Sequence, residues 1–229
     1  MSVNVDTVYQ RVLALTNKEQ RGLLTPQEFN YMANQAQLDI FEQYFYDLNQ
    51  FARLPGNSTE YSDMLDILEE KISLFEKVDV DVTDGVTLPS DVYRLGSITY
   101  NGIEAEQITQ KDWLYIKKSP LSQPTKDFPV YLRDSETNAI KVYATSLTAE
   151  ETTLVKCNYT KAPRKVVWAA NAVTGTYNES ASTPFDVHAS EETELVVKIL
   201  ALAGITLKDP QLYQVGGAED NKNVQQEKA

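Results

Sequence analysis

The spacing of the apolar residues changes at Val78, and this change constrains the fold more than any other feature of the sequence. Before it, apolar side chains recur every three or four residues, which is typical of amphipathic helices. The run Val78-Asp-Val-Asp-Val82 then alternates valine with aspartate, as strands with one buried face do, and Asp84-Gly85 supplies a turn. Further strand patterns follow without a helical pattern between them. The sequence therefore predicts the α+β class, with an N-terminal helical bundle, an antiparallel β-barrel or sandwich, and a C-terminal helix with an extended tail.

Two helices in the first 77 residues are expected from spacing. Val8, Val12 and Leu15 recur at intervals of four and three after Asp6, which we expect to cap a short first helix. Another helix is expected over about residues 58–77, where five apolar side chains keep helical spacing: Tyr61, Leu65, Leu68, Ile72 and Phe75.

The helix between these two has the clearest start in the chain. In Thr25-Pro-Gln-Glu28 the threonine can accept from the Glu28 amide while the glutamate reaches back, with proline at the first helical position. Helical spacing continues to Leu54-Pro-Gly56. Its wide aromatic stripe contains three candidate subunit-interface residues: Phe41, Tyr44 and Phe45. The stripe also suits the core of the chain's own fold, and the sequence leaves both interpretations open.

Four more strands are expected in the central region, over residues 92–100, 130–132, 140–143 and 154–159. Between the first two, residues 117–129 contain three prolines and no periodicity, which predicts a long exposed loop. Pro120, Leu121 and Pro124 of this loop are the second set of candidate subunit-interface residues.

The C-terminal region joins a well-marked helix to a polar tail. Ser190 is expected to cap the helix, the acidic residues after it suit the positive end of the helix dipole, and Gly204 is expected to end it. The last residues, roughly 25 in number, have too few apolar side chains to bury a face of their own, so we expect them to bind a partner. The predicted division is a helical region (1–77), an antiparallel β region (78–168), an extended linker (169–189) and a C-terminal helix with a partner-binding tail (190–229).

The chain has a net charge of -12, with 33 Asp and Glu against 21 Lys and Arg. Such a surface repels phosphate backbones and anionic lipids, which argues against nucleic-acid binding and against membrane attachment. It also suits the wall of a conduit through which DNA slides without sticking, although solubility is the simpler explanation. No signal peptide or apolar span is recognisable, so we expect a protein made in the cytoplasm.

Residues that carry most enzyme chemistry are sparse. The single cysteine, Cys157, lies in an alternating run and is expected to be a strand residue rather than a nucleophile. The single histidine, His188, has no second histidine and no cysteine near it in sequence, so a junction residue is favoured over a base or ligand. Asp79, Asp81 and Asp84 lack the spacing of a calcium loop. We expect no catalytic residue, no metal site and no cofactor.

The central region also contains one basic and aromatic cluster: Lys111, Trp113, Tyr115, Lys117, Lys118, Lys126 and Phe128. Bases could stack there, but Asp112 and Asp127 dilute the charge, so a subunit interface is favoured. A smaller cluster contains Lys161, Arg164, Lys165 and Trp168. Either cluster suits the acidic face of a neighbouring subunit.

In its order of parts, the chain resembles the head-to-tail connector proteins of short-tailed bacteriophages, the adaptor or ring proteins also called tail tubular protein A. The resemblance covers nearly the whole chain and is carried by these segments: Thr25-Pro-Gln-Glu28, Leu88-Pro-Ser-Asp-Val-Tyr-Arg-Leu95, Pro129-Val-Tyr-Leu132, Asn158-Tyr-Thr-Lys-Ala-Pro163 and residues 192–203. In the loop 120–124 and the helix that starts at Ser190, the chain is most similar to ring proteins of crAss-like gut phages.

The resemblance implies a virion protein, not an enzyme, that forms a closed ring of twelve copies. The ring would lie between the portal protein and other tail or ring proteins, and genomic DNA would pass through its lumen without specific binding. Cyclic rings use heterologous interfaces, in which two different faces of each subunit meet. By the same resemblance, the C-terminal segment would become ordered on the portal through four candidate residues: Leu207, Leu212, Tyr213 and Val215.

Two other functions stay open. One is a tail-associated carbohydrate-binding module or enzyme, in which Trp113, Tyr115 and Tyr131 would form a stacking platform for sugars. The other is a lower tail-ring or sheath protein, which differs from the connector only in its neighbours.

Overall fold

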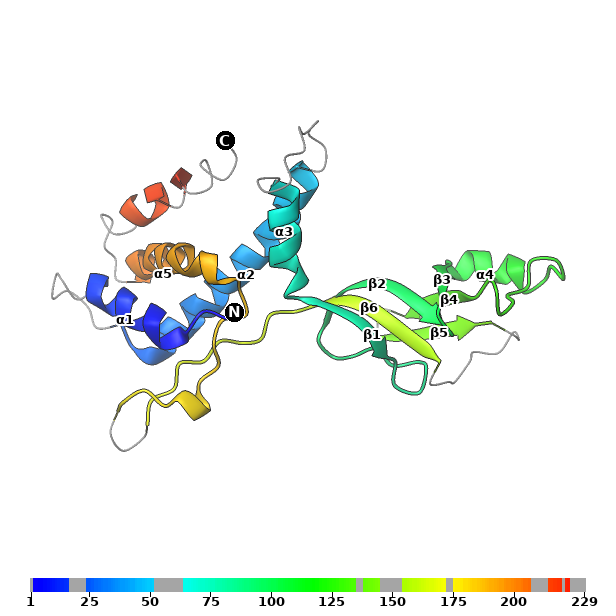
Figure 1. The fold of residues 1–229 in the computed structure, drawn as a ribbon, viewed down its shortest axis with the longest axis horizontal. Helices are drawn as coiled ribbons and strands as arrows, with labels where there is room; N and C mark the ends of the chain where they lie inside the picture. Colours follow the sequence, from blue (N-terminus) through cyan, green and yellow to red (C-terminus); the bar gives the residue numbers. More distant parts are fainter. Residues whose placement is uncertain are drawn as a thin grey trace. The chain divides into compact units, whose positions relative to one another are not determined.

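The computed structural model describes residues 2–16, 24–51, 64–134, 138–144, 154–171, 175–206, 214–219 and 221–222. It divides the chain into two compact units, coloured along the sequence in Figure 1. The helical unit contains residues 1–74 and 163–229, and the β unit contains residues 75–162. This differs from the expected division, because the chain from Pro163 onward packs with the N-terminal helices. The α+β class is confirmed, with the β unit as an insertion in the helical unit.

In its described residues, the helical unit contains four long helices: α1 (Val5–Thr16), α2 (Pro26–Phe51), α3 (Met64–Ser73) and α5 (Glu192–Thr206). Helix α2 packs against α3 and α5, and α1 packs against α5. The capping box that starts α2 is confirmed, since the Thr25 amide donates to Glu28 Oε2 at 2.9 Å and the Glu28 amide donates to Thr25 Oγ1 at 3.3 Å. The expected cap of α1 was wrong by two residues, because Asn4 Oδ1 accepts from the Asp6 amide at 2.8 Å.

Helix α3 ends at Ser73, four residues earlier than expected, because the chain enters the first strand at Glu76. The start expected near residue 58 lies outside the described residues. Of its expected inward side chains, Leu68, Ile72 and Phe75 are buried.

Residues 163–171 and 175–187, here called the return segment, lie along α2 and are held by its side-chain amides. Asn30, Asn34 and Gln37 each bond the backbone in both directions. Asn34, for example, donates to the Val166 carbonyl at 2.9 Å and accepts from the Val166 amide at 2.9 Å. Asn30 does the same for Trp168, while Gln37 donates to the Arg164 carbonyl and accepts from the Asp186 amide. The spacing of four and three places these amides on one face of the helix, where they replace the ladder that a neighbouring strand would supply.

The expected linker is therefore a packed part of the helical unit. Trp168 is buried, its ring centroid lies 4.3 Å from that of Tyr9, and its Nε1 donates to Asp6 at 2.9 Å. Arg164 pairs with Asp186 at 2.6 Å. Of the smaller basic and aromatic cluster expected around Trp168, Trp168 and Arg164 are thus held by contacts within the fold, while Lys165 is exposed.

Helix α5 begins differently from the prediction. A 3-10 turn (Ala189–Glu191) precedes it, and the cap of that turn is His188, whose Nδ1 accepts from the Ser190 amide at 3.3 Å. The helix passes through Gly204 and ends at Thr206, so the expected terminator lies within it. Helical residues 214–219 return to α5, where Gly216 is buried and a Cβ at its position would lie 2.9 Å from the Ala201 Cα. This part of the expected extended tail is packed against the fold.

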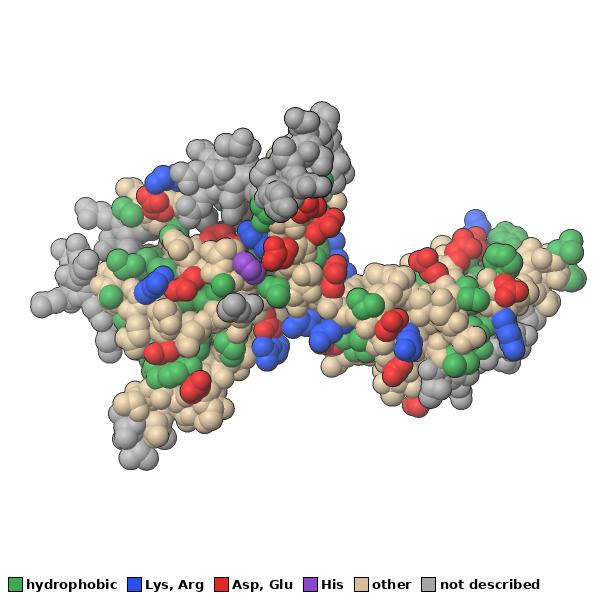
Figure 2. Space-filling model, viewed as in Figure 1, with side chains coloured by type: hydrophobic (Ala, Val, Ile, Leu, Met, Phe, Trp, Pro, Cys, Tyr) green, Lys and Arg blue, Asp and Glu red, His purple; other side chains and the backbone are tan. Residues whose placement is uncertain are grey.

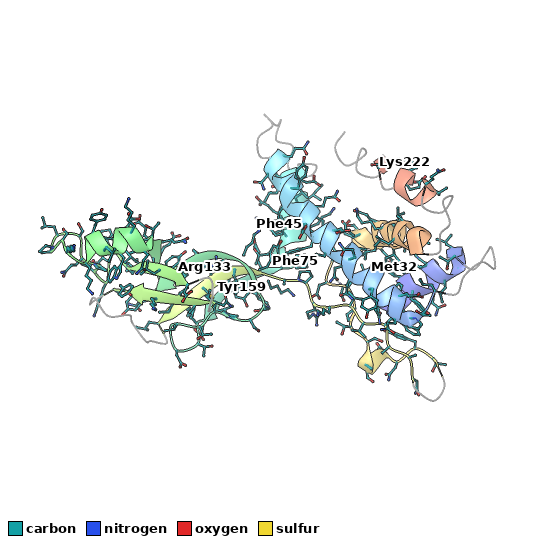
Figure 3. The ribbon with its side chains drawn as sticks, turned by 180° about the vertical axis from the view of Figure 1, so that it is seen from behind. Met32, Phe45, Phe75, Arg133, Tyr159 and Lys222 are labelled. Atoms are coloured by element: carbon teal, nitrogen blue, oxygen red, sulfur yellow. The ribbon has the colours of Figure 1, made fainter. Side chains whose placement is uncertain are left out.

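The β unit is a single curled sheet of six strands: β1 (Glu76–Asp81), β2 (Val92–Tyr100), β3 (Ile103–Gln107), β4 (Val130–Asp134), β5 (Ala139–Tyr143) and β6 (Val155–Lys161). Their order in the sheet is β1-β6-β2-β3-β4-β5. All neighbouring pairs are antiparallel except β3 and β4, which are parallel, so the sheet is mixed rather than wholly antiparallel. Figure 3 labels Arg133 on β4 and Tyr159 on β6, and it labels Met32 and Phe45 at different positions along α2.

Irregular positions curl this sheet. Asp79 has φ 55° where the register of β1 shifts against β6, and its amide donates to Asn158 Oδ1 at 2.8 Å. The register of β2 also shifts against β6, and a Cβ at Gly96 would lie 2.9 Å from the Asn158 carbonyl oxygen. Such bulges bend a strand and increase its twist. The expected alternation of Val78, Val80 and Val82 is therefore broken, and Val78 is exposed.

Two elements of the β unit were not expected. The strand β3 follows a tight turn at Asn101-Gly102, where both residues have positive φ, as a type I′ hairpin requires. The helix α4 (Gln110–Ile116) then connects β3 to its parallel neighbour β4. The expectation of strands without intervening helices was wrong at this point, since a parallel pair needs a crossover connection.

Candidate subunit-contact surface

Helix α4 is fixed at its start and along one face. Thr109 and Asp112 form a capping box, in which Thr109 Oγ1 accepts from the Asp112 amide at 3.2 Å. Trp113 faces inward and stacks on Tyr143, with ring centroids 4.0 Å apart. It shares a small apolar core with Val130, Leu132 and Tyr143. A helix of seven residues is marginal alone, so this packing holds α4 in place.

The loop after α4 is ordered by its own hydrogen bonds, although it contains the three prolines that predicted an irregular segment. The Lys117 amide donates to the Trp113 carbonyl at 2.9 Å and closes the helix. Thr125 and Phe128 then form a narrow turn, in which the Phe128 amide donates to the Thr125 carbonyl at 3.1 Å. Pro124 is buried, while Pro120 is exposed.

Large apolar side chains project from this scaffold into solvent. Leu114 and Tyr115 lie on the outer face of α4, Leu121 is 99% exposed, and Phe128 is 79% exposed. We call these four residues the tip patch. Figure 2 shows hydrophobic side chains gathered at this end of the β unit, with charged side chains between them. Exposed aromatic and aliphatic side chains on a fixed backbone are typical of a protein contact surface.

An open hollow of about 500 Å³ adjoins the tip patch. Its apolar lining comes from the residue after β3, from α4, from the loop and from β4: Ile108, Ile116, Leu121, Pro124, Phe128 and Val130. Interface side chains that contribute most to affinity usually insert into such recesses.

The charge around the tip patch differs from that of the whole chain. Residues 110–128 contain four lysines and two aspartates, and all four lysines are exposed: Lys111, Lys117, Lys118 and Lys126. Over whole units, the helical unit has 11 Lys and Arg against 20 Asp and Glu, whereas the β unit has 10 against 13. The acidic excess of the protein therefore belongs mainly to the helical unit.

The structure separates the two sets of residues expected at a subunit interface. Phe41 is 0% exposed and Tyr44 is 4% exposed, so they belong to the core of the helical unit. Phe45 is half-buried, with its ring centroid 5.1 Å from that of Phe41. Leu121 and Pro120 do lie at the surface, and the buried Pro124 lines the hollow beside them. The sequence interpretation missed Leu114, although the capping box Thr109-Gln-Lys-Asp112 marks the start of its helix.

Of the expected portal-binding residues, Leu207, Leu212 and Tyr213 lie outside the described residues. Val215 is 62% exposed on the short helix that Gly216 holds against α5. In the same helix and its continuation, Lys222 pairs with Glu219 at 3.5 Å.

Cys157 is buried in the sheet, where its Sγ donates to the Val80 carbonyl at 3.6 Å. Burial, followed by the charges of Asp91 and Asp81, raises its pKa to about 11, so the thiol stays protonated at neutral pH. Within the described part of the chain, His, Cys, Asp and Glu side chains do not gather in groups of three that could hold a metal ion. Among the described helices, none is both long and apolar enough to cross a membrane.

Comparison with known proteins does not identify the chain. No protein-family model matches it, and no curated protein matches it significantly.

Proposed function

We propose that this chain is a structural subunit of a ring at the head-to-tail junction of a short-tailed bacteriophage, between the portal and the tail. The observation that carries the proposal is the tip patch, in which Leu121 is 99% exposed and Phe128 is 79% exposed on an ordered loop. A monomer gains nothing from such a surface, whereas a subunit buries it against a neighbour. The family resemblance supplies the ring of twelve copies and the virion location.

The charge distribution supports a role beside DNA. The helical unit has a net charge of -9, from 11 basic and 20 acidic residues, and such a surface repels the phosphate backbone. A lumen lined by it lets genomic DNA pass without specific binding. In this proposal the C-terminal segment binds the portal. Of its candidate contact residues, Val215 is the one that the structure describes, and it is exposed.

The burial pattern weighs against the carbohydrate-binding alternative. A sugar platform would need Trp113, Tyr115 and Tyr131 together at the surface. Trp113 and Tyr131 are buried, so only Tyr115 of the three is exposed.

Light scattering tests the proposal by measuring the mass of the purified chain, alone and after mixing with the portal protein of the same phage. We expect a closed multimer on the portal. The same measurement is made on the double variant Leu121→Ser with Phe128→Ser. This variant should keep the fold, because both side chains are exposed, but it should no longer form the multimer. A chain that ignores the portal contradicts the connector function. If it instead joins a lower tail component, it is a lower tail-ring protein.

A further inference from the structure

The outward face of α2 is another described surface on which exposed aromatic side chains lie beside charged ones. Tyr31, Leu38 and Tyr46 are exposed at helical spacing along it, and Tyr44 is buried on the opposite side of the helix. With a rise of 1.5 Å per residue, Tyr31 and Tyr46 are about 22 Å apart along the helix. This face is therefore long enough to receive a surface of several side chains.

Its charged residues are acidic. Asp39 and Glu42 lie beside Leu38 and are exposed, and Glu28 lies near Tyr31 at the start of the helix. Gln35 donates to Asp39 at 2.7 Å, which orients this carboxylate within the face. We call Tyr31, Leu38, Tyr46, Asp39 and Glu42 the outer α2 face.

We infer that the tip patch of one copy docks on the outer α2 face of the next copy. The inference rests on the proposed ring function and names the two surfaces that close the ring. Leu121 and Phe128 would pack against Leu38 and the tyrosines, while Lys117 and Lys118 approach Asp39 and Glu42.

Charge selects this pairing over the symmetric ones. Two tip patches placed together would bring their neighbouring lysines close to each other, and two outer α2 faces would oppose carboxylates to carboxylates. The mixed pair opposes surfaces of opposite net charge, since residues 110–128 have four lysines against two aspartates and the charged side chains of the outer α2 face are carboxylates. A contact between two different faces is heterologous, so each copy keeps one face for a further neighbour, and repetition gives a ring or a filament.

Disulfide trapping between separately tagged copies tests the inference in the full chain. One copy contains Leu121→Cys and the other contains Leu38→Cys, and the two are mixed on the portal under mild oxidation. Native Cys157 is buried and does not compete. Adjacent cysteines have a millimolar effective concentration, so we expect about tenfold more mixed dimer than in the controls. Two controls use exposed positions elsewhere on each unit: Gln10→Cys with Leu121→Cys, and Arg133→Cys with Leu38→Cys.

The outcomes separate this inference from the proposed function. A dominant Leu121→Cys to Leu38→Cys dimer in a sample with the mass of a ring supports both. A ring without that dimer, or with Leu121→Cys joined mainly to itself or to Gln10→Cys, overturns the inference and leaves the ring function standing. A sample that stays monomeric on the portal overturns the proposed function and the inference with it. Circular dichroism of each variant shows whether the fold is intact.

Discussion

The two units of this chain solve the same burial problem with different residues. The helical unit buries polar groups and satisfies them, through the amides of Asn34 and Gln37 and through the ion pair of Lys71 with Glu191 at 2.7 Å. The β unit joins its segments through the backbone ladders of its strands, and it exposes the aromatic and aliphatic side chains of the tip patch. The difference indicates that α2 holds its own chain together on one side, while the β unit offers apolar surface to a neighbour.

Each unit contains one of the two tryptophans, which makes the comparison measurable. Trp168 lies in the helical unit and Trp113 lies in the β unit. Both are buried. Replacing one by phenylalanine leaves a fluorescence signal that reports the unfolding of the other unit.

The largest expected effect separates a core aromatic from an exposed one. Phe41→Ala removes a fully buried ring, so the free energy of unfolding followed by Trp168 should fall by about 3–5 kcal/mol. Urea unfolding measures it, and Phe128→Ala followed by Trp113 is the matched control, with a change below about 0.5 kcal/mol. Equal losses in the two variants would contradict the assignment of Phe41 to the core and Phe128 to a contact surface.

The next effect tests whether side-chain amides replace a strand ladder. Asn34→Ala leaves the amide and carbonyl of Val166 without their partner, which should cost about 2–4 kcal/mol in the Trp168 signal. Asn49→Ala removes an amide of the same helix that bonds only the Phe45 carbonyl at an exposed position, so little change is expected. If both variants unfold at the same urea concentration, the return segment is not held by α2 in this way.

Sequence patterns predicted the elements whose stabilising residues are close together in the chain. The box at Thr25 and Glu28 forms from residues three apart, and the strand over residues 92–100 has the predicted bounds. The elements β3 and α4 were not predicted, although each follows a local sequence signal: the Asn101-Gly102 turn precedes β3, and the capping box at Thr109 starts α4. They needed no tertiary information.

The other differences depend on contacts between distant residues. The amide of Asn30 meets the backbone of Trp168 across 138 positions, which no local pattern reveals, so the return segment resembled a polar linker. The same limit applies to the candidate interface. Exposure of Leu121 and burial of Tyr44 are both consistent with the sequence, and only the packed fold distinguishes them.

The two units should also respond to opposite extremes of pH. In the β unit, burial and the hydrogen bond to Asp91 raise the pKa of Tyr159 to about 12. Because the folded state holds the neutral phenol more tightly, the stabilisation is complete below the ordinary pKa of 10.0 and is lost as pH rises toward 12. The Trp113 signal should therefore show a loss of about 2 kcal/mol from this residue between pH 9 and pH 12. Tyr159→Phe removes this part of the slope, and an unchanged slope would contradict the role of Tyr159.

In the helical unit the sign is reversed. Burial alone would raise the pKa of Glu191, but the hydrogen bond and charge of Lys71 outweigh it and hold the pKa below its ordinary value of 4.5. This stabilisation is present above pH 4.5 and is lost as pH falls through the folded pKa. The Trp168 signal should lose stability in acid, and Glu191→Gln should weaken that dependence. A Trp113 signal that falls equally in acid would show that the two units do not respond separately.

The smallest effect on stability should accompany a large effect on assembly. Lys117→Glu with Lys118→Glu alters exposed side chains, so each unit should keep its free energy of unfolding within about 0.5 kcal/mol. The same change places carboxylates opposite the outer α2 face and should prevent the multimer from forming on the portal.

A second pair of substitutions in the same chain, Asp39→Lys with Glu42→Lys, reverses the charge of the outer α2 face and should restore the multimer. Either pair of substitutions alone should prevent the multimer from forming. Lys77→Glu with Lys156→Glu, on β1 and β6 toward the opposite edge of the sheet from the strands that pack on α4, is the control for net charge and should assemble normally. Restoration depends on the sign of the charge on both surfaces at once, so a failure to restore with intact folding would mean that Lys117 and Lys118 meet a different partner.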